Sequence, residues 1–259
     1  MIRYKIVVAY DGTDYLGWQA QAQGATVAGV LQQTFKRVFK KEITLVAASR
    51  TDAGVHALGQ VAAFTTDLFL PPDTIRFVWN SKLPPAISIC LLEQVSLSFN
   101  PRHNVVEKRY QYAFSLKRPL PLQARYIWYY RRSIDIDKLR VALALFIGTH
   151  NFRSFCSSEY TGNTVRTIHA IDVVAEDGEK YVITFKGPAF LRHMIRRIVG
   201  ACLHVASCKK LTIDDVKVIM LNHNPEHILK TAPATGLVLV VIEHKELNHQ
   251  YQDDNVQLT

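Results

Sequence analysis

Two series of strand and helix patterns follow the same order in the two halves of the chain. In the first half, residues 2–8 alternate apolar and basic side chains, which is typical of a half-buried strand. Thr26 can cap a helix, and apolar residues then recur at helical spacing through residue 39. Strands at about 43–49, 59–64 and 87–92, with a short helix after Pro71-Pro72, complete the order β-α-β-β-α-β.

The second half repeats this order. We expect a strand at 105–114, a helix at 136–147, two strands at 164–174 and 181–185 around an Asp177-Gly178 turn, a long helix at 189–206, a shorter helix after Thr212, and a strand at 236–242. The pattern predicts an α+β fold of two ferredoxin-like βαββαβ units, whose mainly antiparallel sheets meet at a central cleft. No sequence identity between the halves is evident, so the repeat is one of topology.

These patterns also suggest domain boundaries. We expect one domain at residues 1–100 and a second at 101–245. No Gly/Ser-rich or Pro-rich linker separates the halves, which favours rigid docking. The tail at 246–259 is dominated by Asn, Gln and Asp, so we expect it to be loosely ordered.

The apolar content is that of an ordinary soluble protein. With 259 residues and 48% hydrophobic content, the chain can bury a core without disulfides or metal. Its longest apolar stretches are shorter than the roughly 18 residues that a membrane helix needs, and its N-terminus lacks the pattern of a signal peptide. We therefore expect a cytoplasmic protein with no membrane contact. The four cysteines form no Cys-x-x-Cys pair, which predicts no metal site.

The charge balance points towards an acidic partner. The formal net charge is +9, from 31 basic and 22 acidic residues. Basic residues cluster at 36–41, 102–109, 131–132 and 192–197. Neutralising phosphates releases condensed counterions, so such a surplus favours nucleic acid. Charge alone is equally compatible with a solvated basic surface that binds no nucleic acid.

Asp52 is a candidate reactive carboxylate. It follows an expected strand and begins the turn Asp52-Ala53-Gly54-Val55, so a rigid sheet would display it on a loop. Gly54 gives this loop backbone freedom. Taken alone, an Asp-Ala-Gly sequence is also ordinary turn chemistry, and that reading stays open at this point.

The longer segment around Asp52 resembles a known motif. Ser49-Arg50-Thr51-Asp52-Ala53-Gly54-Val55-His56-Ala57, followed by Gly59-Gln60-Val61, is similar to the catalytic motif of the TruA family of tRNA pseudouridine synthases. Further segments resemble other motifs of this family in the same order: Asp11-Gly12-Thr13, Gly17-Trp18-Gln19, Thr26-Val27, Lys108-Arg109-Tyr110-Gln111-Tyr112, the stretch 190–200 and the stretch 232–237.

Three departures from the family pattern stand out. Ser49 occupies a position that is usually glycine, Leu83-Pro84-Pro85-Ala86 lacks an acidic residue after the prolines, and Gln21-Ala22-Gln23 lacks a Pro-Asn pair. We expect none of them to touch the chemistry, although the last two could alter contacts with tRNA.

The resemblance implies the pseudouridine synthase fold and the roles of three catalytic residues. Asp52 is the expected nucleophile, Tyr110 is expected to pack against the target uracil, and Arg196 is expected to pair with the Asp52 carboxylate. An aromatic ring can offset the free-energy cost of flipping a base out of an RNA stem. From periodicity alone, however, Tyr110 also fits a core tyrosine of an alternating strand.

Further residues of the matched motifs are assigned to binding. We expect substrate contacts from Tyr110, Arg50, His56, Gln60 and Leu237, and RNA contacts from Arg102, Lys108, Arg192, His193 and Arg197. On a helix at 189–206, residues 192, 193, 196 and 197 would share a cationic face. These groups would repel one another unless RNA phosphates or Asp52 met them, although a solvated face is the simpler alternative.

The resemblance also implies a substrate and an assembly. The expected substrate is the anticodon stem-loop of tRNA, at uridines 38 to 40, and the expected assembly is a homodimer. The isomerisation breaks the C1′–N1 bond and joins C5 to C1′ without redox change, so no cofactor is expected. Asp52 could attack uracil C6 or ribose C1′, or help to remove a ribose proton, with Tyr110 as a possible relay for the C5 proton.

Two other functions compete with this assignment. Ferredoxin-like units with exposed aromatics and basic rims also occur in RNA-binding proteins that have no catalytic activity. An aspartyl phosphatase is suggested by Asp11-Gly12-Thr13-Asp14 after the first strand, but its nucleophile motif has a different order of residues.

Replacement of the Asp52 carboxylate distinguishes a catalytic protein from one that only binds RNA. Asp52→Asn should abolish pseudouridine formation on unmodified tRNA transcript, because an amide is not a nucleophile, whereas tRNA affinity should change little. Equal activity of the variant and the wild type would refute the catalytic assignment.

Overall fold

The computed structural model describes residues 1–245 except 22, 177–178, 208–210 and 225–229. The expected Asp177-Gly178 turn and the tail at 246–259 therefore lie outside the described residues. In the first half the elements are β1 (Ile2–Tyr10), α1 (Val27–Phe39), β2 (Val46–Ala47), β3 (His56–Thr66), α2 (Pro72–Asn80) and β4 (Ile87–Val95).

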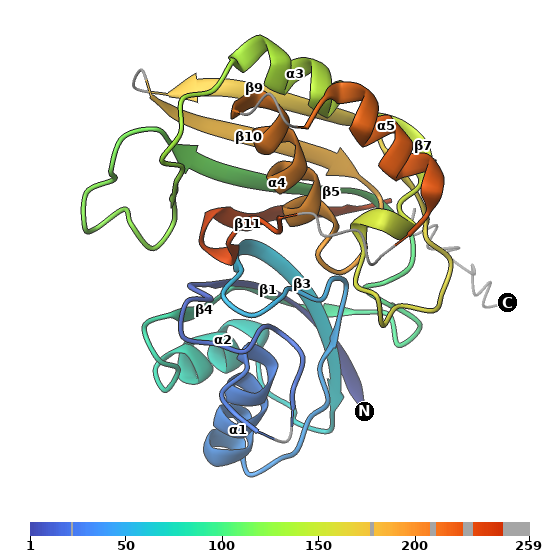
Figure 1. Ribbon diagram of the computed structural model, residues 1–259. Helices are drawn as coiled ribbons and strands as arrows, with labels where there is room; N and C mark the ends of the chain where they lie inside the picture. The colour runs from blue at the N-terminus through green and yellow to red at the C-terminus, as the bar shows by residue number, and fades with distance from the viewer. Residues whose placement is uncertain (22, 177–178, 208–210, 225–229, 246–259) are drawn as a thin grey trace, which may run out of the picture.

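Among the described residues, the second half adds three strands, β6, β7 and β8, and one helix, α5, to the same basic pattern. Figure 1 shows the arrangement of the elements. In chain order its elements are β5 (Val105–Ser115), β6 (Trp128–Tyr129), α3 (Ile136–Ala144), β7 (Gly148–Asn151), β8 (Val165–Ile168), β9 (Ala170–Glu176), β10 (Lys180–Gly187), α4 (Met194–Ser207), α5 (Ile213–Asn222) and β11 (Leu237–His244). Two single-turn 3₁₀ helices, Arg153–Phe155 and Ala234–Gly236, complete the set among the described residues.

The strand order confirms the expected α+β architecture. The first half has the order β4-β1-β3-β2 and the second has the corresponding order β11-β5-β10-β9. Neighbouring strands within each half are antiparallel, apart from the short β5–β6 pair. This is the ferredoxin-like arrangement, found once in each half.

The two sheets do not stay separate. β11 pairs in parallel with β3, through Val238 opposite His56 and Leu239 opposite Ala57, and this makes one continuous nine-stranded sheet. β2 is short, and it pairs only with Ala62 and Ala63 further along β3, so the beginning of β3 is free to take β11. The proposed division at residue 100 falls between β4 and β5 and stays a prediction.

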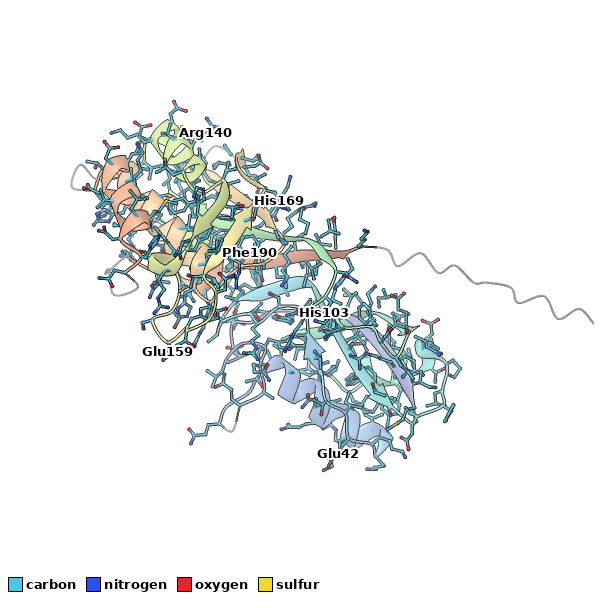
Figure 2. All side chains as sticks on the ribbon, turned by 90° about the vertical axis from the view of Figure 1, so that its right-hand side faces the viewer. Glu42, His103, Arg140, Glu159, His169 and Phe190 are labelled. Carbon is cyan, nitrogen blue, oxygen red and sulfur yellow. The ribbon has the colours of Figure 1, made fainter. Side chains whose placement is uncertain are left out.

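Helices cover each half of the sheet. Figure 1 shows α1 and α2 against the first half and α3, α4 and α5 against the second, and Figure 2 places Glu42, after α1, and Arg140, on α3, at opposite ends of the molecule. In the first half the aromatic rings of Phe35, Phe64 and Trp79 meet edge to face, with centroids 4.8–5.6 Å apart.

The ends of α1 follow local sequence rules. The Thr26 side chain accepts a hydrogen bond from the Gly29 N–H at 3.3 Å, which caps the first turn. Lys40 closes the helix in the left-handed conformation, with φ 58°. Among the described residues, no helix is long and apolar enough to cross a membrane.

Three of the expected elements differ from the structure. The strand expected at 43–49 is paired only at Val46–Ala47, and the strand expected at 164–174 is divided into β8 and β9 at His169, whose N–H binds the Lys186 carbonyl at 2.7 Å. The helix expected from residue 189 begins at Met194, because His193 adopts a left-handed φ of 66° that an α-helix cannot contain. Leu191 and Met194 are buried at helical spacing, and this explains why the periodicity was misleading.

The junction of the halves requires a residue without a side chain. A Cβ on Gly59 of β3 would lie 2.5 Å from the Val240 carbonyl oxygen, in the bulge of β11 between Leu239 and Val241. Glycine therefore permits the close approach of the two strands.

Gly59→Val should lower the free energy of unfolding by about 1–3 kcal/mol or more, because it overpacks this junction. Urea denaturation would measure the loss, with Leu58→Val, an exposed neighbour, as the control. Since valine favours strands, an unchanged or higher stability would show that β3 and β11 are not tightly opposed.

Candidate active site

A cleft of about 990 Å³ opens where the two halves meet. Its walls come from the segment before β3, from β5, from the segment between β7 and β8, and from the approach to α4. The charged and aromatic side chains that line it are Arg50, Asp52, Arg102, Lys108, Tyr110, Glu159, Tyr160, Arg166, Phe190, Arg192, His193 and Arg196.

The loop that carries Asp52 is fastened to the first half at several points. The Thr51 hydroxyl hydrogen-bonds the Tyr10 hydroxyl at 2.8 Å, and the Thr51 carbonyl accepts from the Trp18 N–H at 3.2 Å. Gly54 turns the chain with φ 75°, in the left-handed region that favours glycine, and its N–H donates to the Tyr15 carbonyl. The carboxylate is thereby held at the edge of the cleft.

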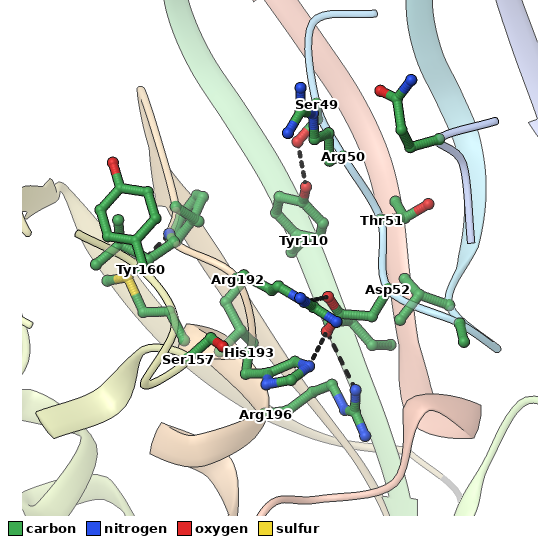
Figure 3. A pocket seen from close by; sticks show the side chains of 18 of the residues that line it. Ser49, Arg50, Thr51, Asp52, Tyr110, Ser157, Tyr160, Arg192, His193 and Arg196 are labelled. Carbon is green, nitrogen blue, oxygen red and sulfur yellow. Dashed lines mark hydrogen bonds and ion pairs between the residues drawn. The ribbon is translucent and has the colours of Figure 1, made fainter. Parts of the chain in front are cut away.

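Three cationic or titratable groups surround the Asp52 carboxylate (Figure 3). Arg196 Nη1 lies 3.1 Å from Oδ2 and His193 Nε2 lies 3.7 Å from the same oxygen, while Arg192 Nε is 3.9 Å from Oδ1. Only 13% of the Asp52 side chain is exposed. The Asp52–Arg196 ion pair is therefore partly desolvated, and it joins residues that are 144 positions apart in the sequence.

The cationic groups do not share one helix face. Arg196 lies in the first turn of α4, but Arg192 and His193 precede the helix, so the expected face of four residues was wrong. The left-handed turn at His193 directs these groups towards Asp52 from the loop. Burial lowers the pKa of His193, and the nearby arginines act in the same direction, while Asp52 opposes them.

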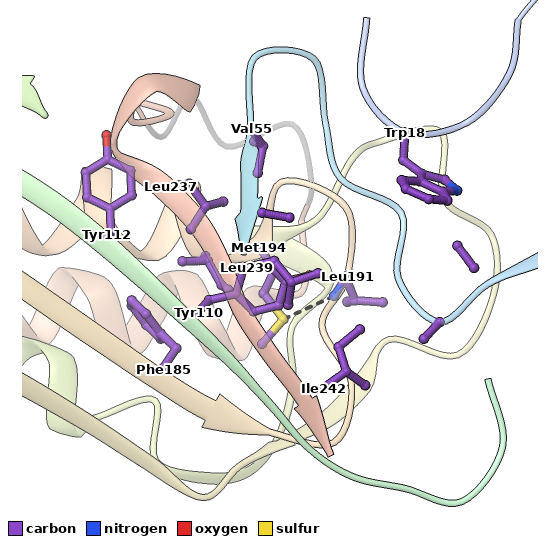
Figure 4. Packing of buried hydrophobic residues seen from close by; sticks show 14 of the residues in the cluster. Trp18, Val55, Tyr110, Tyr112, Phe185, Leu191, Met194, Leu237, Leu239 and Ile242 are labelled. Atoms are coloured by element: carbon purple, nitrogen blue, oxygen red, sulfur yellow. Dashed lines mark hydrogen bonds between the residues drawn. The ribbon is translucent and has the colours of Figure 1, made fainter. Parts of the chain in front are cut away.

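Tyr110 extends from β5 into the floor of the cleft. Its hydroxyl hydrogen-bonds the Ser49 hydroxyl at 2.8 Å, and its ring meets Phe190 edge to face at 5.3 Å. Burial raises its pKa to about 12, and Asp52 adds to the rise while Ser49 opposes it. Figure 4 shows the ring among buried apolar residues that include Leu237 and Met194. The structure thus brings Tyr110, Asp52 and Arg196 to one cleft.

Ser49 contacts one of the three expected catalytic residues. Its hydroxyl hydrogen-bonds the hydroxyl of Tyr110 at 2.8 Å, and the expectation that serine at this position leaves the chemistry untouched stays a prediction. Tyr110 is only 5% exposed, and its hydroxyl already has a hydrogen-bond partner in Ser49.

The other expected substrate contacts are divided between two places. Arg50 and Leu237 line the cleft, whereas the cleft lining does not include His56 or Gln60. Gln60 is fully buried and donates from Nε2 to the Ser49 carbonyl at 2.8 Å. It therefore supports the loop that carries Asp52 from behind.

His56 also lies behind the loop, in a second polar cluster. Its Nδ1 is 3.1 Å from both the Gly12 N–H nitrogen and Asp11 Oδ1, and its ring meets Tyr126 edge to face at 5.1 Å. The Tyr126 hydroxyl donates to Asp11 Oδ2 at 3.0 Å. Burial lowers the pKa of His56 despite the neighbouring carboxylate. Asp11 thus lies outside the cleft lining, where it accepts hydrogen bonds from its neighbours.

The expected RNA contacts fall into two groups as well. Arg102, Lys108, Arg192 and His193 line the cleft, but Arg197 does not. Arg197 donates from Nη1 to the carbonyls of Ser154 and Cys156, and so it braces the 3₁₀ helix after β7.

Among the charged and aromatic residues of the cleft wall, sequence patterns missed four: Glu159, Tyr160, Arg166 and Phe190. Glu159 pairs with Arg192 at 3.3 Å. The first three come from a segment with no recognised motif, and Phe190 was placed on the apolar face of a helix that does not extend so far. Among the described residues, no group of three His, Cys, Asp or Glu is placed to hold a metal ion.

Comparisons with known proteins found related sequences over most of the chain. The family pattern described as tRNA pseudouridine synthase matches residues 6–104 and 142–244. Proteins named tRNA pseudouridine synthase A are 35% identical in Thermodesulfovibrio yellowstonii, over 92% of this chain and 98% of the relative, and 36% identical in Protochlamydia amoebophila, over 95% and 97%. An archaeal box H/ACA sRNP Nop10-Cbf5 structure aligns with 77% of this chain and 43% of its own, at 14% identity and a TM-score of 0.33.

The buried position of Lys108 in the cleft should make folding stability depend on pH. Burial, with help from Arg166 and Arg102, lowers its pKa from 10.5 to about 8. Between these two values the unfolded chain holds a proton that the folded protein has released, so folding stability should rise with pH across this window.

Relative to Lys108→Met, which does not titrate there, the free energy of unfolding of the wild type should increase between pH 8 and 10.5 by about 3 kcal/mol at most. Urea unfolding at a series of pH values would measure the difference. A difference that is constant with pH would mean that Lys108 is not desolvated.

Proposed function

The chain belongs to the tRNA pseudouridine synthase family and isomerises uridine to pseudouridine in tRNA, and we propose that Asp52 is the nucleophile of this reaction. The observation that supports the proposal most strongly is the 3.1 Å contact between Arg196 Nη1 and Asp52 Oδ2 inside the cleft. It couples the carboxylate of one half of the chain to a cation of the other half.

The two oxygens of Asp52 have different surroundings. Oδ2 is anchored by Arg196, whereas Oδ1 accepts no hydrogen bond from the described residues and has Arg192 Nε at 3.9 Å. An ionised oxygen with little competition from hydrogen bonding is the better nucleophile. We therefore assign the attack to Oδ1 and the orientation of the carboxylate to Arg196.

Three chemical routes can begin from this carboxylate. Oδ1 can attack uracil C6, attack ribose C1′, or take a proton from the ribose. In each route the C1′–N1 bond breaks, the freed uracil turns, C5 bonds to C1′ and the C5 proton leaves. The bond between Tyr110 and Ser49 does not favour Tyr110 as the relay for that proton.

Tyr110 supplies a surface for the flipped base. A uracil stacked in RNA cannot reach Asp52, and extruding it costs a few kcal/mol. Contact with an aromatic ring recovers about 1–3 kcal/mol per base. Phe190 holds the Tyr110 ring edge to face, so this surface is preorganised, and Leu237 adds an apolar wall.

We propose the anticodon stem-loop of tRNA as the substrate region, a homodimer as the assembly and the cytoplasm as the location, as the resemblance to the TruA family implies. The net charge of +9 and the cations of the cleft are consistent with an RNA partner. No step of the proposed reaction needs a cofactor.

Mapping of pseudouridines in unmodified tRNA, incubated with the protein, tests this proposal. The wild type should convert uridines of the anticodon stem-loop, and Arg196→Gln should convert the same uridines at least about a hundredfold more slowly, because Asp52 loses its orienting ion pair. Arg140→Gln, which removes an exposed guanidinium from α3, should match the wild type. Conversion elsewhere in the tRNA would refute the substrate region, and full activity of Arg196→Gln would refute the role of the ion pair.

A further inference from the structure

Three cations gather in the cleft beside Tyr110, apart from the group around Asp52. They are Arg102, before β5; Lys108, on β5; and Arg166, on β8. Each is held by carbonyl groups: Arg102 Nε donates to Ala47 at 3.2 Å, Lys108 Nζ donates to Ala48 at 2.8 Å, and Arg166 Nη1 donates to Asn163 at 2.9 Å. The three side chains are therefore fixed in place from three separate segments.

No carboxylate neutralises this group within the described part of the chain. The acidic side chains of the cleft lining are Asp52 and Glu159, and both form ion pairs on the α4 side, the latter with Arg192. Lys108 is only 8% exposed, and both arginines lie close enough to lower its pKa further. A buried ammonium between two guanidinium groups is unfavourable unless an anion joins them.

The donors of the group are only partly used. An ammonium has three N–H donors, and the Ala48 carbonyl accounts for one of those of Lys108. The buried Nε of Arg166 has no hydrogen-bond partner in this structure. A buried donor without a partner is unfavourable, and a bound anion nearby would offset part of that cost.

We propose that Arg102, Lys108 and Arg166 form a binding site for one backbone phosphate of the RNA substrate. A phosphodiester offers one negative charge and two free oxygens, which suits converging guanidinium and ammonium donors. The site rests on the proposed function only in taking RNA as the source of the phosphate.

The position of the site on β5 indicates which phosphate it binds. Lys108 and Tyr110 are two residues apart and point to the same face of the strand, roughly 7 Å from each other along it. If the uracil lies on the Tyr110 ring, the phosphate must belong to the flipped nucleotide or to its immediate neighbour. The three cations then anchor the backbone beside the point at which the base leaves the stem.

Substrate RNA with uncharged backbone linkages tests the site directly. In the tRNA, each phosphate within one nucleotide of a mapped target uridine would be replaced in turn by a methylphosphonate. Binding would be measured with Asp52→Asn protein, so that no turnover occurs. At one linkage the replacement should weaken binding roughly tenfold or more, because a charge-assisted hydrogen bond is lost. In protein that also carries Arg166→Gln or Arg102→Gln, the same replacement should weaken binding by a clearly smaller factor, because one of the three cations is already absent.

Arg140→Gln is the matched control, since Figure 2 shows Arg140 at the far end of the second half from the junction, and it should keep the full penalty. Arg102 is exposed, so Arg102→Gln should fold normally. The test therefore still works if Arg166→Gln fails to fold. Equal penalties at every linkage in all the variants would overturn the phosphate site. Pseudouridine formation by the wild type is scored separately, so a failure of the proposed activity would not be mistaken for a failure of this site.

Discussion

The parallel pairing of β3 with β11 is the contact on which the rest of the molecule depends. It comprises only two opposed residue pairs, yet it turns two ferredoxin-like units into one sheet. β3 begins just after the Asp52 loop, β11 begins with Leu237 at the cleft, and β5, the neighbour of β11, carries Tyr110. A slip of one residue in this pairing would turn each side chain of the slipped strand to the other face of the sheet.

Charge is the second constraint on this junction. Asp52 lies between Arg196, His193 and Arg192, so the α4 side of the cleft is neutralised in part by the chain itself. On the other side, no carboxylate of the described residues neutralises Arg102, Lys108 and Arg166. In the proposed reaction, this asymmetry would orient the RNA, with the base towards the carboxylate and the backbone towards the cations.

Local signals in the sequence predicted the parts of the fold that depend on periodicity. The cap at Thr26 and the alternation in β1 and β5 were sufficient, because neighbouring residues impose them. Family resemblance supplied the meeting of Asp52, Tyr110 and Arg196, which no local pattern contains. The fusion of the sheets depends on pairing between distant strands, and the left-handed turn at His193 departs from the conformation that its apolar spacing favours, so neither could be read from a local window.

The fusion also limits how many strand edges the molecule presents. Two independent four-stranded sheets would have four edges with unpaired N–H and carbonyl groups, and such edges promote association with other chains. Because β11 pairs with the free beginning of β3, the strand order of the fused sheet ends at β4 on one side and at β9 on the other. The short β2 therefore has a structural consequence. It leaves the beginning of β3 unpaired on one side, and the pairing of β11 there covers strand edges that could otherwise promote aggregation.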